Sequence, residues 1–254
     1  MKNNFDSLVL FYKADSELHE CMKKAGFTIS ETLEKIEGLT NILNDKQVAE
    51  LKKNVTIQKF LKNEIIYNEG DVPSHLLCLI SGKVKVYKTG VGGRTQIIRV
   101  IKPVQYLGYR AYFANQNYVT AASAFETSYI CKIPMDIIYR WMKDNNELCL
   151  FFVKQLSVDL GVSDKRTVSL TQKHIRGRLA EALLFLLENY GLEEDGATLS
   201  IYLTREDLAN LSNMTTANAI RTLSAFASEK IVAIDGRKIK IINLEAVKKI
   251  SKIG

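Results

Sequence analysis

The feature that most constrains the fold is a run of short segments toward the C-terminal end of the chain. Thr204, followed three residues later by Asp207, has the pattern of a helix cap and begins a first short helix. Thr215 can cap a second helix after a tight turn. The buried stripe of that helix is expected at Ala219, Leu223, Phe226 and Ala227. Asp235-Gly236 between two apolar runs predicts a hairpin. Helix, turn, helix and hairpin in this order predict a winged helix-turn-helix.

Positive charge is concentrated in the same region. From Arg221 to Lys252 there are eight basic and three acidic residues, a net charge of +5, and the whole chain carries +7. Such a concentration is typical of a module that binds the polyanionic backbone of a nucleic acid. A solvated surface without a partner is the alternative interpretation of the same charges.

Residues 54–134 have the texture of a β structure. Short runs rich in Val, Ile and Tyr alternate with glycine-bearing turns, and Lys83–Lys88 strictly alternates charged and apolar side chains. Alternation is what a strand with one buried face requires, and several such strands at regular spacing predict a small antiparallel roll. Gly90–Gly93 joins two of the predicted strands without opening a helix, so we interpret it as a hairpin turn.

Helical spacing flanks the roll on both sides. Residues 1–53 predict an N-terminal helical segment, with a cap at Asn44 or Asp45. Residues 135–171 predict one long helix with a stripe at three- and four-residue spacing. The stripe consists of Cys149, Phe152, Leu156, Leu160, Ser163, Thr167 and Leu170. Because its last part is polar, it fits a seam between two copies of the chain beside a ligand pocket better than a monomer core.

The remaining residues, 172–254, form the predicted DNA-binding part. A helix ending at Gly191 and a short strand at Leu199–Leu203 lead into the winged helix-turn-helix. The fold class is therefore α+β, with an N-terminal antiparallel β-roll, a long helix and a C-terminal winged helix-turn-helix.

Several other function classes find no support in the sequence. The four cysteines, Cys21, Cys78, Cys131 and Cys149, are far apart and match neither a metal-ligand nor a disulfide pattern. No secretory signal and no uncharged run of membrane-spanning length is present, so we expect a cytoplasmic protein without a membrane partner. With three histidines and no catalytic motif, the chain is not expected to be an enzyme.

The order of these parts resembles the cAMP receptor/fumarate-nitrate regulator (Crp/Fnr) family from about Leu39 to Asn243. Three stretches carry the resemblance: Glu64–Lys88, Ile175–Ala182 and Leu203–Gly236. The resemblance implies a cyclic-nucleotide-binding-like jelly roll as sensor and a homodimer joined through the long helix. It further implies transcription regulation by binding double-stranded DNA. In activators it implies a contact with RNA polymerase, to which no residue here is assigned.

The resemblance also assigns the second helix of the helix-turn-helix to the major groove. The positions that match base-reading positions of the family are Thr216, Ala217 and Arg221, with Asn218 between them. Thr215 and the wing residues Arg237 and Lys238 would hold phosphates. The planar fork of an arginine can contact guanine O6 and N7. Many members carry arginine and glutamate where this chain has Thr216 and Ala217, so we do not expect their consensus operator.

The sensor departs from the cyclic-nucleotide cassette of the family. The matching stretches are Gly108-Tyr109-Arg110 and Val119-Thr120-Ala121, in which Tyr109 replaces a ribose-binding glutamate and Val119 a phosphate-binding arginine. Losing a buried arginine–phosphate pair costs roughly 2–5 kcal/mol, so cAMP binding is not expected. Arg110, in an extended or turn segment, should point elsewhere. Ser163 and Asp164 match positions that touch the base. Two alternatives stay open, an unidentified small effector or a roll packed shut by Tyr106, Tyr109, Tyr112 and Phe113.

No cofactor is expected. An iron–sulfur cluster of the family needs closely spaced N-terminal cysteines, and only Cys21 stands there. Haem is disfavoured, because His75 near Cys78 is a lone histidine at a strand start, and His174 has a structural position before the DNA-binding part. The alternative function is a winged helix that binds a protein partner. Salt dependence separates the two functions, since phosphate contacts weaken steeply with salt.

Overall fold

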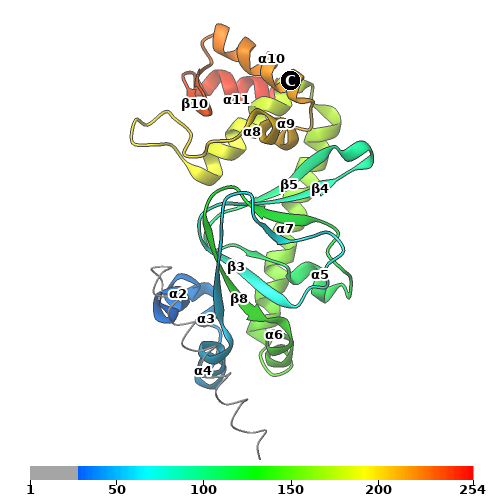
Figure 1. Cartoon of the computed structure of the whole chain (residues 1–254), viewed down its shortest axis with the longest axis vertical. Helices are drawn as coiled ribbons and strands as arrows, with labels where there is room; N and C mark the ends of the chain where they lie inside the picture. The colour runs from blue at the N-terminus through cyan, green and yellow to red at the C-terminus, as the bar shows by residue number, and fades with distance from the viewer. Residues whose placement is uncertain (1–27, 254) are drawn as a thin grey trace, which may run out of the picture. The chain divides into compact units, whose positions relative to one another are not determined.

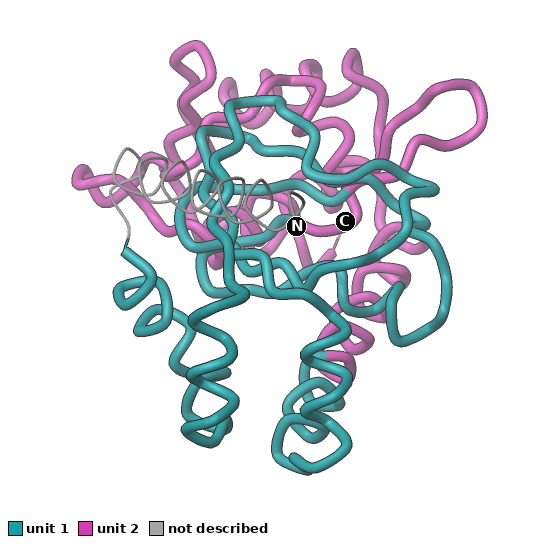
Figure 2. The backbone as a smooth tube through the Cα atoms, turned by 60° about the horizontal axis from the view of Figure 1, so that its bottom comes forward, with its two compact units in different colours: residues 1–86, 100–155 teal, residues 87–99, 156–254 magenta. Residues whose placement is uncertain are grey.

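The computed structural model describes residues 28–253, which belong to two compact units. Unit 1 comprises residues up to Val86 and Val100–Gln155, and unit 2 comprises Tyr87–Arg99 and Leu156–Gly254 (Figure 2). The roll lies mostly in unit 1 and the helix-turn-helix in unit 2. The hairpin that carries residues 87–99 is assigned to the second unit, although its strands begin and end in the first.

Three short helices precede the roll: α2 (Ile29–Lys35), α3 (Glu37–Thr40) and α4 (Asp45–Asn54). A capping box begins α4, in which the Asn44 side chain accepts from the backbone N–H of Gln47 and the Gln47 side chain accepts from that of Asn44, both at 3.0 Å. The predicted cap at Asn44 is confirmed. Residues 1–27, and with them Cys21, lie outside the described residues.

The roll consists of two four-stranded sheets, in the orders β1-β8-β3-β6 and β2-β7-β4-β5. The strands are β1 (Thr56–Phe60), β2 (Ile65–Tyr67), β3 (His75–Ser81), β4 (Val84–Thr89), β5 (Thr95–Ile101), β6 (Tyr106–Leu107), β7 (Ala121–Ala124) and β8 (Ser128–Pro134). β3 runs antiparallel to β8 (Figure 1). In the register of this pair, Cys78 lies opposite Cys131. Gly92 and Gly93, both at φ +76°, form the turn between β4 and β5, as predicted. The predicted antiparallel roll is confirmed.

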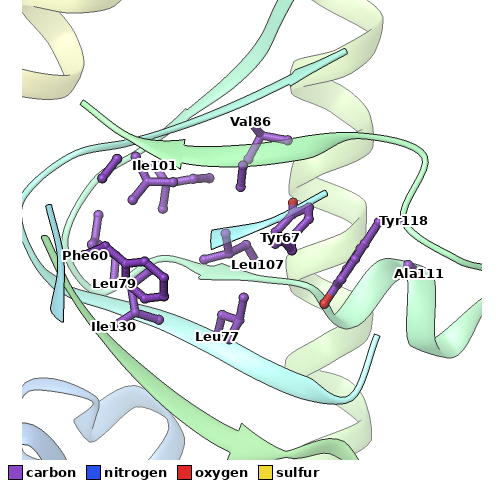
Figure 3. Close-up of a cluster of buried hydrophobic side chains, with 13 residues drawn as sticks. Phe60, Tyr67, Leu77, Leu79, Val86, Ile101, Leu107, Ala111, Tyr118 and Ile130 are labelled. Atoms are coloured by element: carbon purple, nitrogen blue, oxygen red, sulfur yellow. The ribbon is translucent and has the colours of Figure 1, made fainter. Parts of the chain in front are cut away.

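The interior of the roll is filled by side chains of alternating strand residues. These side chains form one hydrophobic cluster, to which Leu77 and Leu79 of β3 and Ile130 of β8 contribute (Figure 3). Two stacked tyrosines also belong to this cluster. The rings of Tyr67 and Tyr118 lie 4.0 Å apart at an interplanar angle of 23°. Burying this apolar surface is the main stabilising contribution to the roll.

The predicted long helix is in fact two helices, α6 (Met135–Met142) and α7 (Asn146–Gln172). Asn145 separates the two helices, because its side chain binds the backbone of α7 and of the segment before α4. Its Oδ1 accepts from the backbone N–H of Leu148 at 3.1 Å, and its Nδ2 donates to the carbonyl of Ile42 at 2.8 Å. Asparagine at such a position caps the following helix and so ends the continuity of the preceding one.

Unit 2 contains the end of α7, then α8 (Ile175–Tyr190), α9 (Arg205–Leu211), α10 (Thr216–Ser228), β9 (Val232–Asp235), β10 (Lys238–Ile241) and α11 (Leu244–Ile253). Gly191 ends α8 at φ +70°, as predicted. The predicted strand at Leu199–Leu203 is wrong, since that segment forms only one isolated bridge, between Leu199 and Leu192. Helix α11, which packs on α8, was not predicted.

Candidate nucleic-acid interface

The helix-turn-helix is built on two threonine caps. The Thr204 hydroxyl accepts from the backbone N–H of Asp207 at 3.0 Å and begins α9. The Thr215 hydroxyl accepts from that of Asn218 at 3.2 Å and begins α10. Both predicted caps are confirmed. They fix where each helix starts and thereby which side chains α10 buries.

One face of α10 is buried and the other is open to solvent. The buried residues are Ala219, Thr222, Leu223 and Phe226, three of them in the predicted stripe; Ala227 is half-buried. Thr215, Thr216, Ala217 and Arg221 are exposed, and Asn218 is half-buried. The Asn218 side-chain oxygen accepts a hydrogen bond from Arg221 Nη2 at 2.5 Å, which orients the guanidinium along the helix. The sequence-assigned residues of this helix therefore lie together.

Ile220 is a further exposed residue of α10 that the sequence assignment missed. Its side chain is 45% exposed, beside Arg221 on the open face. The signal was present in the spacing, since Ile220 lies outside the predicted stripe at 219, 223, 226 and 227.

The predicted wing is the hairpin of β9 and β10. Gly236 adopts φ +53° in its turn, and its carbonyl accepts from Arg205 Nη2 at 2.7 Å, so the start of α9 holds the turn. Arg237 at the tip is exposed. Lys238 is exposed as well, with its Nζ 3.8 Å from a carboxylate oxygen of Glu193 and 5.4 Å from the Tyr202 ring. The turn and both assigned cations are thus at the surface.

The loop after α8 places carboxylates against the lysines of the wing, which the sequence did not indicate. Lys240 Nζ lies 3.2 Å from the Asp195 carboxylate. The backbone N–H groups of Thr198 and Ala197 also donate to that carboxylate and hold the pKa of Asp195 well below its usual range. Asp195 is therefore a fixed anion that offsets part of the charge of Lys240.

Arg166 on α7 donates hydrogen bonds to three backbone carbonyls near the helix-turn-helix, and no sequence motif pointed to it. Its Nη2 donates to the carbonyls of Ile97 at 2.5 Å and Leu211 at 3.0 Å, and its Nη1 donates to that of Ile98 at 2.9 Å. Gln96 makes a parallel link, because its side-chain amide donates to the carbonyl of Asn210 at 2.8 Å. The last carbonyls of α9 are thus bound by groups on β5 and α7, all within unit 2.

In the roll, the residues that match the cyclic-nucleotide cassette lie in and around a short helix. Gly108, at φ +95°, precedes the short helix α5 (Tyr109–Phe113), so the predicted extended or turn segment is wrong. A Cβ at Gly108 would lie 2.9 Å from the His75 carbonyl and 3.0 Å from the Tyr118 hydroxyl, which explains the glycine by crowding. Arg110 is exposed, and Thr120 is half-buried.

Aromatic side chains surround α5. Tyr109 is buried with its ring 5.6 Å from that of Phe152, and Phe113 packs against the same ring at 5.1 Å. Tyr106 meets Phe151 at 5.4 Å. Tyr112 contacts Phe113 in turn, so the aromatic residues expected to close the roll form one chain of contacts with the start of α7. Burial raises the pKa of the Tyr106 hydroxyl, which has no hydrogen-bond partner among the described residues.

Ser163 and Asp164 are both exposed on the part of α7 that belongs to unit 2. The predicted stripe of α7 does not share one environment, because Phe152 is buried whereas Leu160 is 63% exposed. The exposed apolar residues of this helix are Leu150, Val153, Val158, Leu160, Val162 and Val168.

Among the described residues, His75 and Cys78 have local partners, since Ser74 lies beside His75 and Cys78 Sγ donates to the Leu79 carbonyl at 3.9 Å. The Nδ1 atom of His75 lies 2.8 Å from the Ser74 hydroxyl, and burial and Lys132 lower the pKa of this half-buried side chain. Burial raises the pKa of Cys131 to about 12. Within residues 28–253, no three His, Cys, Asp or Glu side chains gather as metal ligands, and no helix is long and apolar enough to cross a membrane.

Two known domain families match most of the described part of the chain. A cyclic nucleotide-binding domain model matches residues 57–145, and a Crp-like helix-turn-helix domain model matches residues 177–250. The chain belongs to the Crp/Fnr family. Members of this family are transcription regulators with a DNA-binding helix-turn-helix, so the α+β class and the winged helix-turn-helix expected from the sequence are confirmed.

Relatives in the Crp/Fnr family are distant in sequence but similar over most of their length. The CRP-like cAMP-activated global transcriptional regulator of Mycobacterium tuberculosis is 23% identical over 209 residues, which cover 82% of this chain and 93% of that protein. Regulatory protein HlyX of Actinobacillus pleuropneumoniae is 25% identical over 220 residues, 86% of each chain. The structure of a Crp/Fnr-family regulator from Eubacterium rectale has a TM-score of 0.72 at 20% identity, covering 84% of this chain and 97% of its own. FixK2 from Bradyrhizobium japonicum has a TM-score of 0.70 at 19% identity, covering 77% and 96%.

Proposed function

We propose that this Crp/Fnr protein is a dimeric, sequence-specific DNA-binding regulator whose α10 enters the major groove. The observation that carries the proposal is the exposed face of α10, where Arg221 is held by Asn218 and stands free of any ion pair among the described residues. An arginine oriented in this way can donate two parallel hydrogen bonds to guanine O6 and N7.

The residues around Arg221 would fix the register of α10 on the duplex. Thr215 and Thr216 are exposed at the N-terminus of α10, where hydroxyl and backbone N–H groups suit a phosphate. Arg237 at the wing tip would hold a second phosphate, and Lys238 would do so at the expense of its contact with Glu193. These contacts carry affinity, and Arg221 carries sequence preference.

The homodimer is part of the proposal, and α7 supports it. The apolar side chains of Leu160 and its exposed apolar neighbours are in contact with solvent along a helix of 27 residues. A second copy of the same helix would cover that surface and place two α10 helices for two half-sites, roughly 34 Å apart on the DNA.

We propose that the roll binds an effector other than cAMP, or binds no effector. One relative is named as cAMP-activated. In this chain Tyr109 is buried against Phe152, and Val119 is 44% exposed, so neither supplies the carboxylate and guanidinium that ribose and cyclic phosphate require. We expect calorimetric titration with cAMP to give no saturable heat.

A contact with RNA polymerase belongs to the proposal only if the protein activates its targets.

Selection from random duplex DNA at two salt concentrations tests the proposed function. We expect a two-fold symmetric site to be enriched by the wild type, weakened by salt and lost with Arg221→Ala. Lys59→Ala removes one exposed positive charge from strand β1 and serves as the charge-matched control, which should select the same site. If no site is enriched, with or without added cell extract, the DNA-binding function is wrong, and a winged helix that binds a protein takes its place.

A further inference from the structure

Helix α10 carries a large apolar side chain on its proposed DNA-facing side that belongs neither to the buried core nor to the polar contacts of the helix. Ile220 is 45% exposed, whereas Leu223 and Phe226 of the same helix are buried. Its backbone position places it on the surface beside Arg221, and the side chains three and four residues before it, Ala217 and Thr216, share that face. Ile220, Ala217 and the Thr216 methyl group thus form an apolar strip beside the Arg221 guanidinium.

The small size of the flanking residues leaves Ile220 as the side chain that reaches furthest beside Arg221. Ala217 has only a methyl group, and Ser224, also exposed, is short. Polar readout of a base edge requires a donor or acceptor, and Ile220 and Ala217 have neither. A base edge that lies against Ile220 and Ala217 must therefore be recognised by apolar contact.

The floor of the major groove offers one apolar group, the C5-methyl of thymine. A guanine, adenine or cytosine edge placed against Ile220 would lose its water without gaining a hydrogen bond, which is costly. A thymine instead presents its methyl group to such a contact, which removes apolar surface of both partners from water. Resting on the proposed function, we propose that Ile220 is a specificity-determining residue that contacts a thymine methyl next to the guanine bound by Arg221.

Deoxyuridine provides the direct test, because it removes the methyl group and keeps base pairing. The selected operator is synthesised with each thymine replaced in turn, symmetrically in both half-sites, and its affinity for wild-type protein is measured. We expect at least one thymine whose replacement weakens binding about fourfold per half-site, the effect of one buried methyl group. Ile220→Ala should bind the thymine and uracil operators equally, and Ile220→Val should keep most of the difference.

Ile253→Ala is the matched control, since Ile253 is also an exposed isoleucine, 75% accessible on α11. It should discriminate thymine from uracil as the wild type does. Equal wild-type affinity for all uracil operators, or discrimination that survives in Ile220→Ala, would overturn the role of Ile220 while leaving the DNA-binding function intact. If no operator is selected, or if Arg221→Ala binds as well as the wild type, the proposed function fails and the role of Ile220 fails with it.

Discussion

Arg166 Nη2 and the carbonyl of Leu211 are joined by a hydrogen bond of 3.0 Å, which ties the long helix α7 to the last residue of α9. The same guanidinium binds the carbonyls of Ile97 and Ile98 on β5. Burial lowers the pKa of Arg166, and carbonyl dipoles compensate for the lost water. The helix-turn-helix is therefore held against the β4–β5 hairpin by one side chain and by the parallel bond from Gln96.

Replacing Arg166 by alanine should destabilise unit 2. Three backbone carbonyls lose the hydrogen bond from Arg166, and that of Ile97 keeps the second bond that Gln96 Nε2 donates at 3.2 Å. We therefore expect the free energy of unfolding to fall by about 1–3 kcal/mol in chemical denaturation. Arg166→Lys should recover only part of this, because an ammonium group cannot bridge the same separated acceptors with a planar fork. An alanine variant as stable as the wild type would show that these bonds contribute nothing net.

The exposed apolar residues of α7 predict how the dimer can be broken. Leu160→Glu should convert a dimer into a monomer, measured by analytical ultracentrifugation, because a buried leucine contributes about 1.5–3 kcal/mol in each copy and a buried carboxylate opposes association. Val91→Glu, at a fully exposed position in the β4–β5 turn, is the control and should stay dimeric. A Leu160→Glu protein that remains dimeric would place the interface elsewhere.

The wing predicts unequal salt effects. Arg237→Ala should lower the slope of log affinity against log salt by about 1, the loss of one phosphate contact. Lys240→Ala should change the slope less, because Asp195 already lies 3.2 Å from its ammonium group. Fluorescence anisotropy at several salt concentrations measures both slopes. Equal slopes for the two variants would contradict the importance of the Asp195 pairing.

His75 predicts a pH dependence of stability. Burial and Lys132 lower its pKa from 6.5, and the nearby Asp136 opposes this only in part. The unfolded chain therefore takes up the proton first, so this contribution to stability is complete above about pH 6.5 and is lost as the pH falls below it. His75→Gln should show a flatter decline of melting temperature between pH 7 and 5. An unchanged slope would contradict this assignment.

The local elements of unit 2 could be predicted because their signals are local. Thr204 and Thr215 cap their helices through bonds that span three residues, and Gly236 shapes a two-residue turn. The roll could be predicted as well, because its strands alternate apolar and polar side chains. The break between α6 and α7 was missed because Asn145 binds Ile42, about a hundred residues away in sequence, and such a partner leaves no periodic trace.

The candidate site could be predicted where it depends on exposure along one helix and not where it depends on tertiary contacts. Arg221 and Thr216 follow from the position of α10 within the motif. The bonds of Arg166 link three elements through backbone carbonyls, which no residue pattern encodes. The pairing of Lys240 with Asp195 likewise depends on how a loop folds back onto the wing.

The measurement that tests the central proposal most directly is the ratio of affinities for the selected operator and for a scrambled duplex, determined for wild type and Arg221→Ala at one salt concentration. We predict that the alanine variant loses about 1–3 kcal/mol of operator binding per half-site, while its affinity for scrambled DNA changes little. Equal loss on both duplexes would make Arg221 a phosphate contact only, and no loss on either would contradict the assignment of α10 to the major groove.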